Sequence, residues 1–305
     1  MTLRNQPTSG SQHRIEADGY AATYASVGAT LRELSFEGRD LIWSFDADEV
    51  RPSMAGALLA PWPGRTADGS YEFAGARHQL ALSDPSRGNA IHGLIAWHSF
   101  ECIARTENAV TLRGYVEPQR GYPWRLRVEV ASSVSADGLR QRITISNESS
   151  TPAPVGIGTH PYLVIDAAVA DAVNGWQLTL PANEVMSFDD RMLPAAVVPV
   201  QTAPDLDFRA PRPVGSTALN HAYTALAGTT AQVTDANGRG VEIWWDADVT
   251  WLVAYTADYA EGDATRNSLA IEPMTCPPDA LTSGADLRVL APGEQTTLEW
   301  GIRAI

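Results

Sequence analysis

The sequence predicts an all-β protein built as one large sandwich of antiparallel sheets. Apolar and polar residues alternate over many short segments, which is the spacing of a half-buried strand. Turn signals such as Asp137-Gly138 and Asn237-Gly238 separate these segments. No segment carries a long helical pattern of apolar residues. Short, regularly spaced strands with Gly and Asp turns are typical of an antiparallel sandwich.

The expected strands follow one another along most of the chain. In the run that begins at Leu126, apolar residues alternate with Arg125, Arg127 and Glu129, and a second alternating run follows Asp137-Gly138, so these two runs predict a hairpin. In chain order, we expect strands at 21–27, 41–45, 73–82, 110–115, 126–130, 139–145, 176–180, 231–235, 241–245, 251–256 and 297–302. Six prolines interrupt residues 181–220, which predicts a long ordered loop at one end of the sandwich.

The 305 residues are expected to form a single domain after a short tail. Residues 1–12 are polar and rich in Ser, Thr and Gln, so they predict a disordered N-terminal tail. The 20 prolines are scattered, so no linker divides residues 13–305. The oligomeric state is expected to be a monomer or a homodimer.

The charge of the chain excludes several classes of partner and chemistry. The formal net charge is −14, and all 22 basic residues are Arg. An acidic chain is a poor match for nucleic acid or for an anionic membrane surface, so neither is an expected partner. Without Lys there can be no Schiff base, no pyridoxal phosphate anchor and no phosphate-loop lysine.

The N-terminus and the cysteines predict a cytoplasmic protein. Residues 1–13 lack the apolar segment of a secretory signal, and no apolar run reaches membrane-spanning length. Cys102 and Cys276 form no C-x-x-C pair, which speaks against a disulfide framework or a structural zinc site.

Three titratable residues lie in unusual local contexts. They occur in Asn89-Ala90-Ile91-His92-Gly93, Gly158-Thr159-His160-Pro161-Tyr162 and Ile271-Glu272-Pro273-Met274. Flanking Gly, Pro and apolar residues predict a rigid and partly dry backbone, which shifts pKa values and fixes side-chain direction. His92, His160 and Glu272 are therefore candidates for acid–base catalysis, although each taken alone would also suit a turn or a core position.

Other chemistries fit the sequence less well. There is no G-x-S-x-G elbow and no H-E-x-x-H helix. Gly156-Ile157-Gly158 lacks the third glycine of a dinucleotide loop. Two histidines and a carboxylate can bind a metal, but the His-Gly and His-Pro contexts are not those of a metal cage, so no metal and no cofactor are expected. Paired proton transfer between an imidazole and a carboxylate remains.

The segments that carry these three residues, together with one further segment, resemble the aldose 1-epimerase (galactose mutarotase) family. The resemblance rests on four segments in the family's order and covers the chain after the tail. They are Pro61-Trp62-Pro63-Gly64-Arg65 with Asp68–Phe73, Asn89–Leu94 with Trp97 after it, Gly158–Tyr162, and Ile271–Thr275. Asp207-Phe208-Arg209 and Asn220-His221-Ala222-Tyr223 also fall in the family's order.

The resemblance implies a galactose mutarotase-like β-supersandwich that interconverts the α and β anomers of a free hexose without a cofactor. It implies that Glu272 takes the proton of the anomeric hydroxyl, that His160 protonates the ring oxygen, and that His92 polarises the same region. It further implies that Arg65 holds sugar hydroxyls. Asn220 and Asn89 are further expected substrate contacts. The aromatic residues near these motifs can stack on a sugar face or pack in the core, and they are Trp62, Trp97, Tyr162 and Trp124.

Three positions depart from the family's pattern. Gly64 stands where many relatives have Asn, Ala96 stands where some have Arg, and Asn220 stands where better-known members have Asp. Since Asn donates as well as accepts hydrogen bonds, the preferred pattern of sugar hydroxyls is open.

Three alternatives also stay open. A glycoside hydrolase or lyase needs a second carboxylate, for which Asp68, Asp205 and Asp207 are candidates. A hexose 6-phosphate epimerase needs a cluster of Arg, with Arg51, Arg65, Arg77 and Arg87 available. A non-catalytic carbohydrate-binding protein needs neither.

Overall fold

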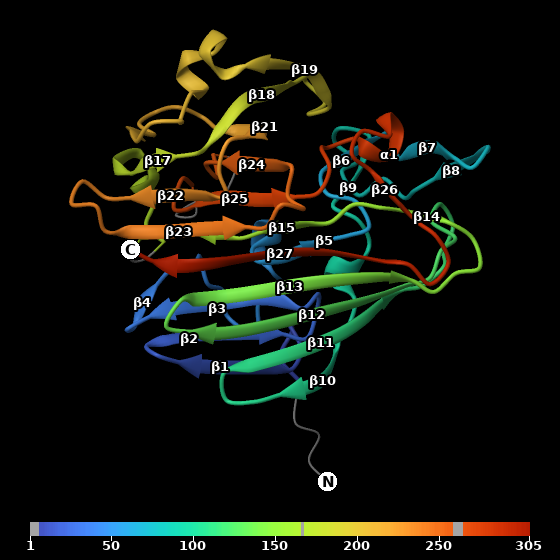
Figure 1. The fold of residues 1–305 in the computed structure, drawn as a ribbon, viewed down its shortest axis with the longest axis horizontal. Coiled ribbons are helices and arrows are strands. Elements are labelled where there is room, and N and C mark those ends of the chain that lie inside the picture. The colour runs from blue at the N-terminus through green and yellow to red at the C-terminus, as the bar shows by residue number, and fades with distance from the viewer. Residues whose placement is uncertain (1–5, 166–167, 259–264) are drawn as a thin grey trace.

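The computed structural model describes residues 6–165, 168–258 and 265–305, and it is nearly all β (Figure 1). The first large sheet has nine strands in the order β10-β11-β12-β13-β27-β23-β22-β17-β20. All its pairs are antiparallel. Their bounds are Glu101–Arg105, Ala109–Val116, Leu126–Ser135, Gly138–Asn147, Gln295–Ala304, Gly240–Trp245, Thr230–Thr234, Gln177–Thr179 and Arg212–Pro213, respectively.

The second large sheet has the order β19-β18-β21-β24-β25-β15-β5, and β16 also pairs with β25. These strands span Pro194–Pro199, Ala182–Phe188, Asn220–Leu226, Trp251–Tyr255, Leu269–Met274, Gly158–His160, Ala57–Leu59 and Tyr162–Leu163 (β16). We call this sheet, including β16, the eight-stranded sheet. The expected all-β sandwich of antiparallel sheets is therefore confirmed.

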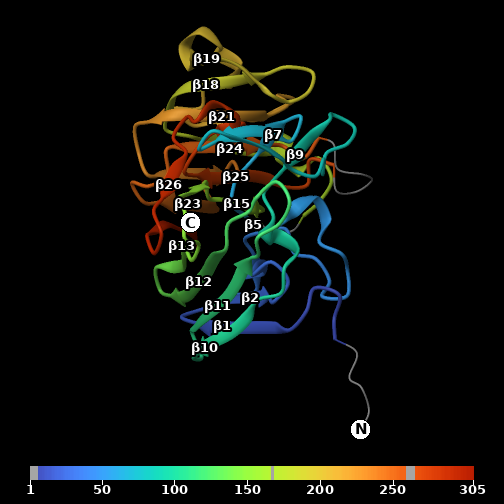
Figure 2. The ribbon, with the colours of Figure 1, turned by 90° about the vertical axis from the view of Figure 1, so that its right-hand side faces the viewer.

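Smaller elements complete the fold. A four-stranded sheet packs against β11, β12 and β13, beneath the green strands in Figure 1. Three strand pairs, β6–β9, β7–β8 and β14–β26, lie at one end of the large sheets, on the right in Figure 1, and this end faces the viewer in Figure 2. In the four-stranded sheet, β1, β2, β3 and β4 span Gln12–Ala17, Tyr20–Ala25, Thr30–Phe36 and Arg39–Asp40, respectively. In the first pair, β6 is Arg65–Ala67 and β9 is Asn89–Ile91. In the last pair, β14 is Ala153–Val155 and β26 is Arg288–Leu290. The pair β7–β8 spans Ser70–Phe73 and Ala76–Gln79. The short helices are η1 Pro52–Met54, η2 Ile95–Trp97, η3 Ala172–Gly175, η4 Val200–Thr202, η5 Pro204–Leu206 and α1 Ala280–Ser283.

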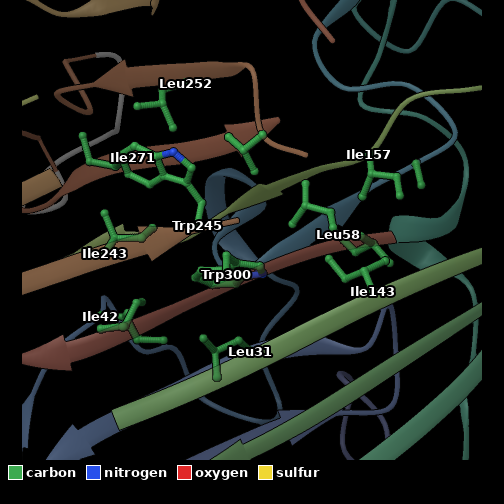
Figure 3. Close-up of a cluster of buried hydrophobic side chains, with 14 of the residues drawn as sticks. Leu31, Ile42, Leu58, Ile143, Ile157, Ile243, Trp245, Leu252, Ile271 and Trp300 are labelled. Carbon is green, nitrogen blue, oxygen red and sulfur yellow. The ribbon is translucent and has the colours of Figure 1, made fainter. Parts of the chain in front are cut away.

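The main core lies between the two large sheets. Figure 3 shows Ile143, Ile243 and Trp300 of the nine-stranded sheet facing Leu252 and Ile271 of the eight-stranded sheet. These side chains are buried because successive residues of a strand point to opposite faces, so each alternating run delivers one apolar face to the same interior. The predicted hairpin is present, with Ser135 paired to Gly138 at the turn between β12 and β13.

The prediction of a long loop over 181–220 is wrong. This segment contains β18 and β19, which pair with each other at the edge of the eight-stranded sheet. Pro194 and Pro199 are tolerated because they bound an edge strand, where a missing N–H breaks no ladder on the outer side. The strand expected at 41–45 is also displaced, since β4 is Arg39–Asp40 and Ile42 makes only an isolated bridge to Leu163.

The predicted tail is held to the domain in its second half. The Ser9 N–H donates to the Ala47 carbonyl over 2.9 Å, and β1 begins at Gln12. Residues 1–5 of the predicted tail lie outside the described residues. Within the described ranges, no helix combines the length and apolar character needed to cross a membrane.

Removing buried methyl groups between the sheets should destabilise the fold. Ile143 is fully buried in β13, so Ile143→Ala should lower the free energy of unfolding by about 2–5 kcal/mol through lost burial and a cavity. Ile103→Ala removes the same atoms from an exposed position of β10 and should change it by less than about 0.5 kcal/mol. Urea denaturation of both variants measures the difference, and equal losses would contradict the assignment of the core.

Candidate active site

The eight-stranded sheet has the core on one face and a cavity on the other. Along β25, Ile271 points into the core whereas Glu272 and Met274 line a cavity of about 560 Å³. Along β24, Leu252 packs in the core whereas Val253 lines the same cavity. Strand alternation alone thus places Glu272 opposite the core, on the face that a ligand can reach. The volume is in the range of small-molecule sites.

The sheet brings His160 and Glu272 into direct contact. β25 pairs with β16 through Leu269 and Ala270 and with β15 through Met274, so its ladder on this side is interrupted at 271–273, although β24 pairs with it on the other side. His160-Pro161 and Pro273 lie at this interruption, where proline's missing N–H needs no ladder partner. There the Nε2 atom of His160 lies 3.3 Å from the Oε1 atom of Glu272.

The ring of His160 is fixed from one side by Tyr162. The two rings stack with centroids 4.8 Å apart and an interplanar angle of 25°. The hydroxyl of Tyr162 donates to the Ser53 carbonyl over 3.0 Å, which fixes the tyrosine in turn. The buried Nδ1 atom of His160 has no hydrogen-bond partner among the described residues. The Nε2 atom of His160 is therefore the ring nitrogen that can exchange a proton with Glu272.

Burial shifts the pKa of each group in the direction that favours its neutral form. Burial lowers the pKa of His160 to about 3, and the nearby positive charge of Arg51 acts in the same direction. Burial raises the pKa of Glu272 well above its usual range, and the charge of Arg65 opposes that shift only in part. Burial therefore favours a single proton shared by the pair over two separate charges, and this proton can lie on either side of the 3.3 Å contact.

His92 lies beside this pair on the turn after β9. Its ring centroid is 5.5 Å from that of His160, at an interplanar angle of 78°. The backbone N–H of Gly64 donates to the Nδ1 atom of His92 over 3.3 Å, and the backbone N–H of His92 donates to the Gly64 carbonyl over 2.9 Å. Burial, followed by the charge of His160, lowers the pKa of His92 well below its usual range. The neutral ring therefore carries its proton on Nε2 and can donate from there.

Glycine is required at the turn that carries His92. His92 itself has φ of 61°, and Gly93 has φ of 73°. A Cβ atom on Gly93 would lie 2.1 Å from the Ala60 carbonyl oxygen, so no other residue fits this approach. The His-Gly context noted in the sequence thus has a steric cause.

Arg65 enters the cavity from β6 and is held by an acidic partner. Its Nε atom donates to Asp84 over 2.8 Å, and Arg87 lies 3.6 Å from the same carboxylate. Burial opposes ionisation of Asp84, but the hydrogen bonds of Arg65 and Ser86 outweigh it and lower the pKa of that carboxyl. Arg65, Asp84 and Arg87 all line the cavity, where they form a charged wall next to the apolar sheet face.

The structure brings most, but not all, of the predicted site residues together. Glu272, His160, His92, Arg65, Asn220 and Tyr162 line the cavity. Trp62 does not: it is fully buried and packs near Tyr122, with ring centroids 6.4 Å apart. Asn89 does not either, because its amide donates to the Arg191 carbonyl and its Oδ1 atom accepts from the Arg191 guanidinium. Trp62 is therefore part of the core, and Asn89 binds Arg191 outside the cavity.

Several cavity residues escaped the sequence analysis. They share apolar or neutral side chains with no catalytic signal of their own: Ser53, Met54, Phe188, Met192, Val253, Tyr255 and Met274. Alternation in β24 and β25 could have placed Val253 and Met274, but not the loop residues. Among the described residues, no group of three His, Cys, Asp or Glu side chains is placed to hold a metal ion.

Comparison with known proteins places the chain among carbohydrate epimerases. A family model described as aldose 1-epimerase matches residues 11–303. The uncharacterized protein YihR of Escherichia coli (strain K12) is 32% identical over 99% of this chain and 96% of its own length. The galactose mutarotase of Homo sapiens is 24% identical over 63% of this chain and 59% of its own length.

Solved structures share the fold at low sequence identity. A GalM/aldose epimerase homologue from C. elegans superposes with a TM-score of 0.82 at 19% identity, covering 97% of this chain and all of the other. The galactose 1-epimerase of Lactobacillus acidophilus gives 0.79 at 18% identity, covering 96% and 94%. The fold is therefore the expected galactose mutarotase-like one. The family model spans nearly the whole chain, and this protein belongs to the aldose 1-epimerase family.

Proposed function

We propose that this protein interconverts the α and β anomers of a free aldose, with Glu272 as the base and His160 as the acid. Family membership supports anomer interconversion in general. The observation that carries the assignment of residues is the 3.3 Å contact between His160 and Glu272 at the wall of a sugar-sized cavity.

The geometry suits the two oxygens of a hemiacetal. The anomeric oxygen and the ring oxygen are bonded to the same carbon, so two groups that lie side by side can each reach one of them. Glu272 accepts the proton of the anomeric hydroxyl while His160 donates a proton to the ring oxygen. The bond between C1 and the ring oxygen breaks, and C1 becomes a carbonyl. Rotation about C1–C2 and the reverse proton transfers then close the ring on the other face.

The proton of the pair makes this cycle self-contained. Burial of both groups favours a protonated Glu272 and a neutral His160. Moving that proton across the contact produces a carboxylate and an imidazolium, which are the forms that ring opening needs. The charge of Arg65 favours the ionised carboxylate. After ring opening the proton lies on Glu272 again, so no proton from water enters the cycle.

Neighbouring residues bind and orient the sugar. His92 donates from Nε2 toward the oxygens of the reacting centre. Arg65, fixed by Asp84, donates to sugar hydroxyls. Asn220 at the start of β21 both donates and accepts. The apolar side chains of Val253 and Met274 lie beside Glu272 in the cavity and suit C–H groups close to the reacting carbon.

The rival activities receive less support. Of the described residues lining the cavity, only Asp84 and Glu272 are carboxylates. Asp84 accepts hydrogen bonds from Arg65 and Ser86, so it is not free to act as the second group of a hydrolase. Arg65 and Arg87 share that same carboxylate, which leaves little free positive charge for a phosphate. Release of aglycone from aryl glycosides would favour hydrolysis instead.

Removing the base should abolish catalysis but spare binding. Glu272→Gln keeps the shape of the side chain but replaces the basic carboxylate with an amide that cannot take up a proton, so the rate should fall by about 10²–10⁴-fold. Polarimetry on freshly dissolved pure anomers of several aldoses measures the rate and identifies the preferred sugar. The control is Glu72→Gln, the same change at an exposed position of β7, which should leave the rate unaltered.

The outcome also separates an enzyme from a binding protein. If wild-type protein binds sugars but accelerates mutarotation of none, the non-catalytic alternative holds. If Glu272→Gln retains full activity, the carboxylate is not the base.

The pH profile should be flat on the acid side of neutrality. The rate should fall only where the pair gains a second proton, near the pKa of about 3 for His160, or loses its proton above the raised pKa of Glu272. We therefore expect no loss of enzymatic rate between pH 7 and about pH 5 after subtraction of the spontaneous reaction. Polarimetry across this range tests it, and an acid limb centred near pH 6.5 would show a histidine with an ordinary pKa.

A further inference from the structure

One large aromatic side chain stands exposed at the rim of the cavity. Trp97, the last residue of η2, has a relative exposure of 54% and lines the cavity five positions after His92. Trp62 and Trp300, in contrast, are buried in the core. An indole exposes a large apolar surface to water, so its position at the mouth of a polar cavity needs a reason.

A buried arginine holds this indole in place. The guanidinium carbon of Arg51 lies 4.3 Å from the centroid of the Trp97 ring. Its Nη2 atom donates to the carbonyl of Ala96, the residue before the tryptophan, over 2.8 Å, and its Nη1 atom donates to the Thr30 hydroxyl. The charge therefore covers one face of the ring and fixes the backbone beside it.

Apart from its charge, which helps to lower the pKa values of His160 and His92, Arg51 has no evident role among the described residues beyond these contacts. Its side chain forms no ion pair with a described carboxylate, and its buried Nε atom has no hydrogen-bond partner. Burial lowers the pKa of this guanidinium to about 10, which reflects the cost of keeping the charge out of water. A charge held at such a cost for contacts around Trp97 indicates that the position of the indole matters.

The same turn reaches the catalytic pair. Ser53 and Met54, which follow Arg51-Pro52, line the cavity in left-handed backbone conformations with φ of 46° and 64°. The Ser53 carbonyl accepts the hydrogen bond of Tyr162, on which His160 stacks. Residues 51–54, which we call the rim turn, thus contact both the exposed indole and the support of the acid. Left-handed residues other than glycine persist only where the surroundings enforce them.

We propose that Trp97 is a stacking platform for the apolar C–H face of the sugar ring, and that Arg51 is the residue that positions it. The identity of the ligand rests on the proposed function. With one ring face covered by Arg51, the indole presents its exposed surface at the rim of the cavity. A rigid platform there adds binding energy that is equal for both anomers, so it acts on substrate affinity and not on the chemical step.

The first test separates binding from chemistry. Trp97→Ala should raise KM for the preferred aldose about ten-fold while kcat changes by less than about two-fold. Trp97→Phe keeps a smaller aromatic face and should recover part of the affinity. The control Val289→Ala truncates another exposed apolar residue, on β26 and away from the cavity, and should change neither constant. An unchanged KM in Trp97→Ala would overturn the proposal.

The second test asks whether Arg51 acts through the indole. Arg51→Met should raise KM, and Arg51→Lys, which keeps a cation for the ring, should restore part of it. The double variant Arg51→Met/Trp97→Ala should have the KM of Trp97→Ala alone. Additive effects on KM would show that Arg51 does not work through Trp97. A merely structural role would lower the unfolding temperature without this non-additivity or rescue.

The platform and the proposed catalysis can fail separately. Calorimetric titration of Glu272→Gln with D-glucose and D-galactose measures affinity without turnover, with and without Trp97→Ala. Weaker binding on loss of the indole supports the platform even if the wild type accelerates no mutarotation. Unchanged binding rejects the platform even if the epimerase activity is present. If neither sugar binds to the wild type, the platform is rejected together with the function on which it rests.

Discussion

A carboxyl group and an imidazole lie out of water on one face of an apolar sheet, and each is the other's partner. Isolated burial of either charge would cost several kcal/mol, so both groups are pushed toward their neutral forms. A pair 3.3 Å apart escapes most of this cost by holding a single proton between the two groups. The surrounding fold serves to keep that distance while leaving one side open to a ligand.

The sheet meets this requirement through the simplest property of a strand. Because consecutive side chains point to opposite faces, Ile271 is part of the core and Glu272 is part of the cavity. Pro161 and Pro273 lie where the pairing of β25 with β15 and β16 is interrupted, while β24 still pairs with β25 on its other side. The side chains of His160 and Glu272 meet at this interruption. The stability of the sandwich and the position of the Glu272 carboxyl therefore depend on the same strand.

The chemistry and the choice of sugar have different structural origins. His160 and Glu272 belong to strands in the middle of a large sheet, where the backbone has little freedom. Asp84, the rim turn and Trp97 lie in loops and short helices around the cavity. Loops carried by a rigid scaffold tolerate change better than the strands beneath them. The three departures from the family's pattern, Gly64, Ala96 and Asn220, also line the cavity, with Asn220 as the first residue of β21. They lie outside the His160–Glu272 pair, so they can alter specificity while the pair stays intact.

The sequence by itself determined the all-β class, the hairpin at Asp137-Gly138 and the three catalytic candidates, because strand alternation, turn preference and short motifs are local properties. It misjudged 181–220, since an edge strand tolerates the prolines that a central strand excludes. Only the tertiary structure decided that Trp62 and Asn89 are buried outside the cavity while Ser53, Phe188 and Met192 line it. Which face of an element meets a cavity depends on contacts between distant segments, and those arise only when the sheets pack.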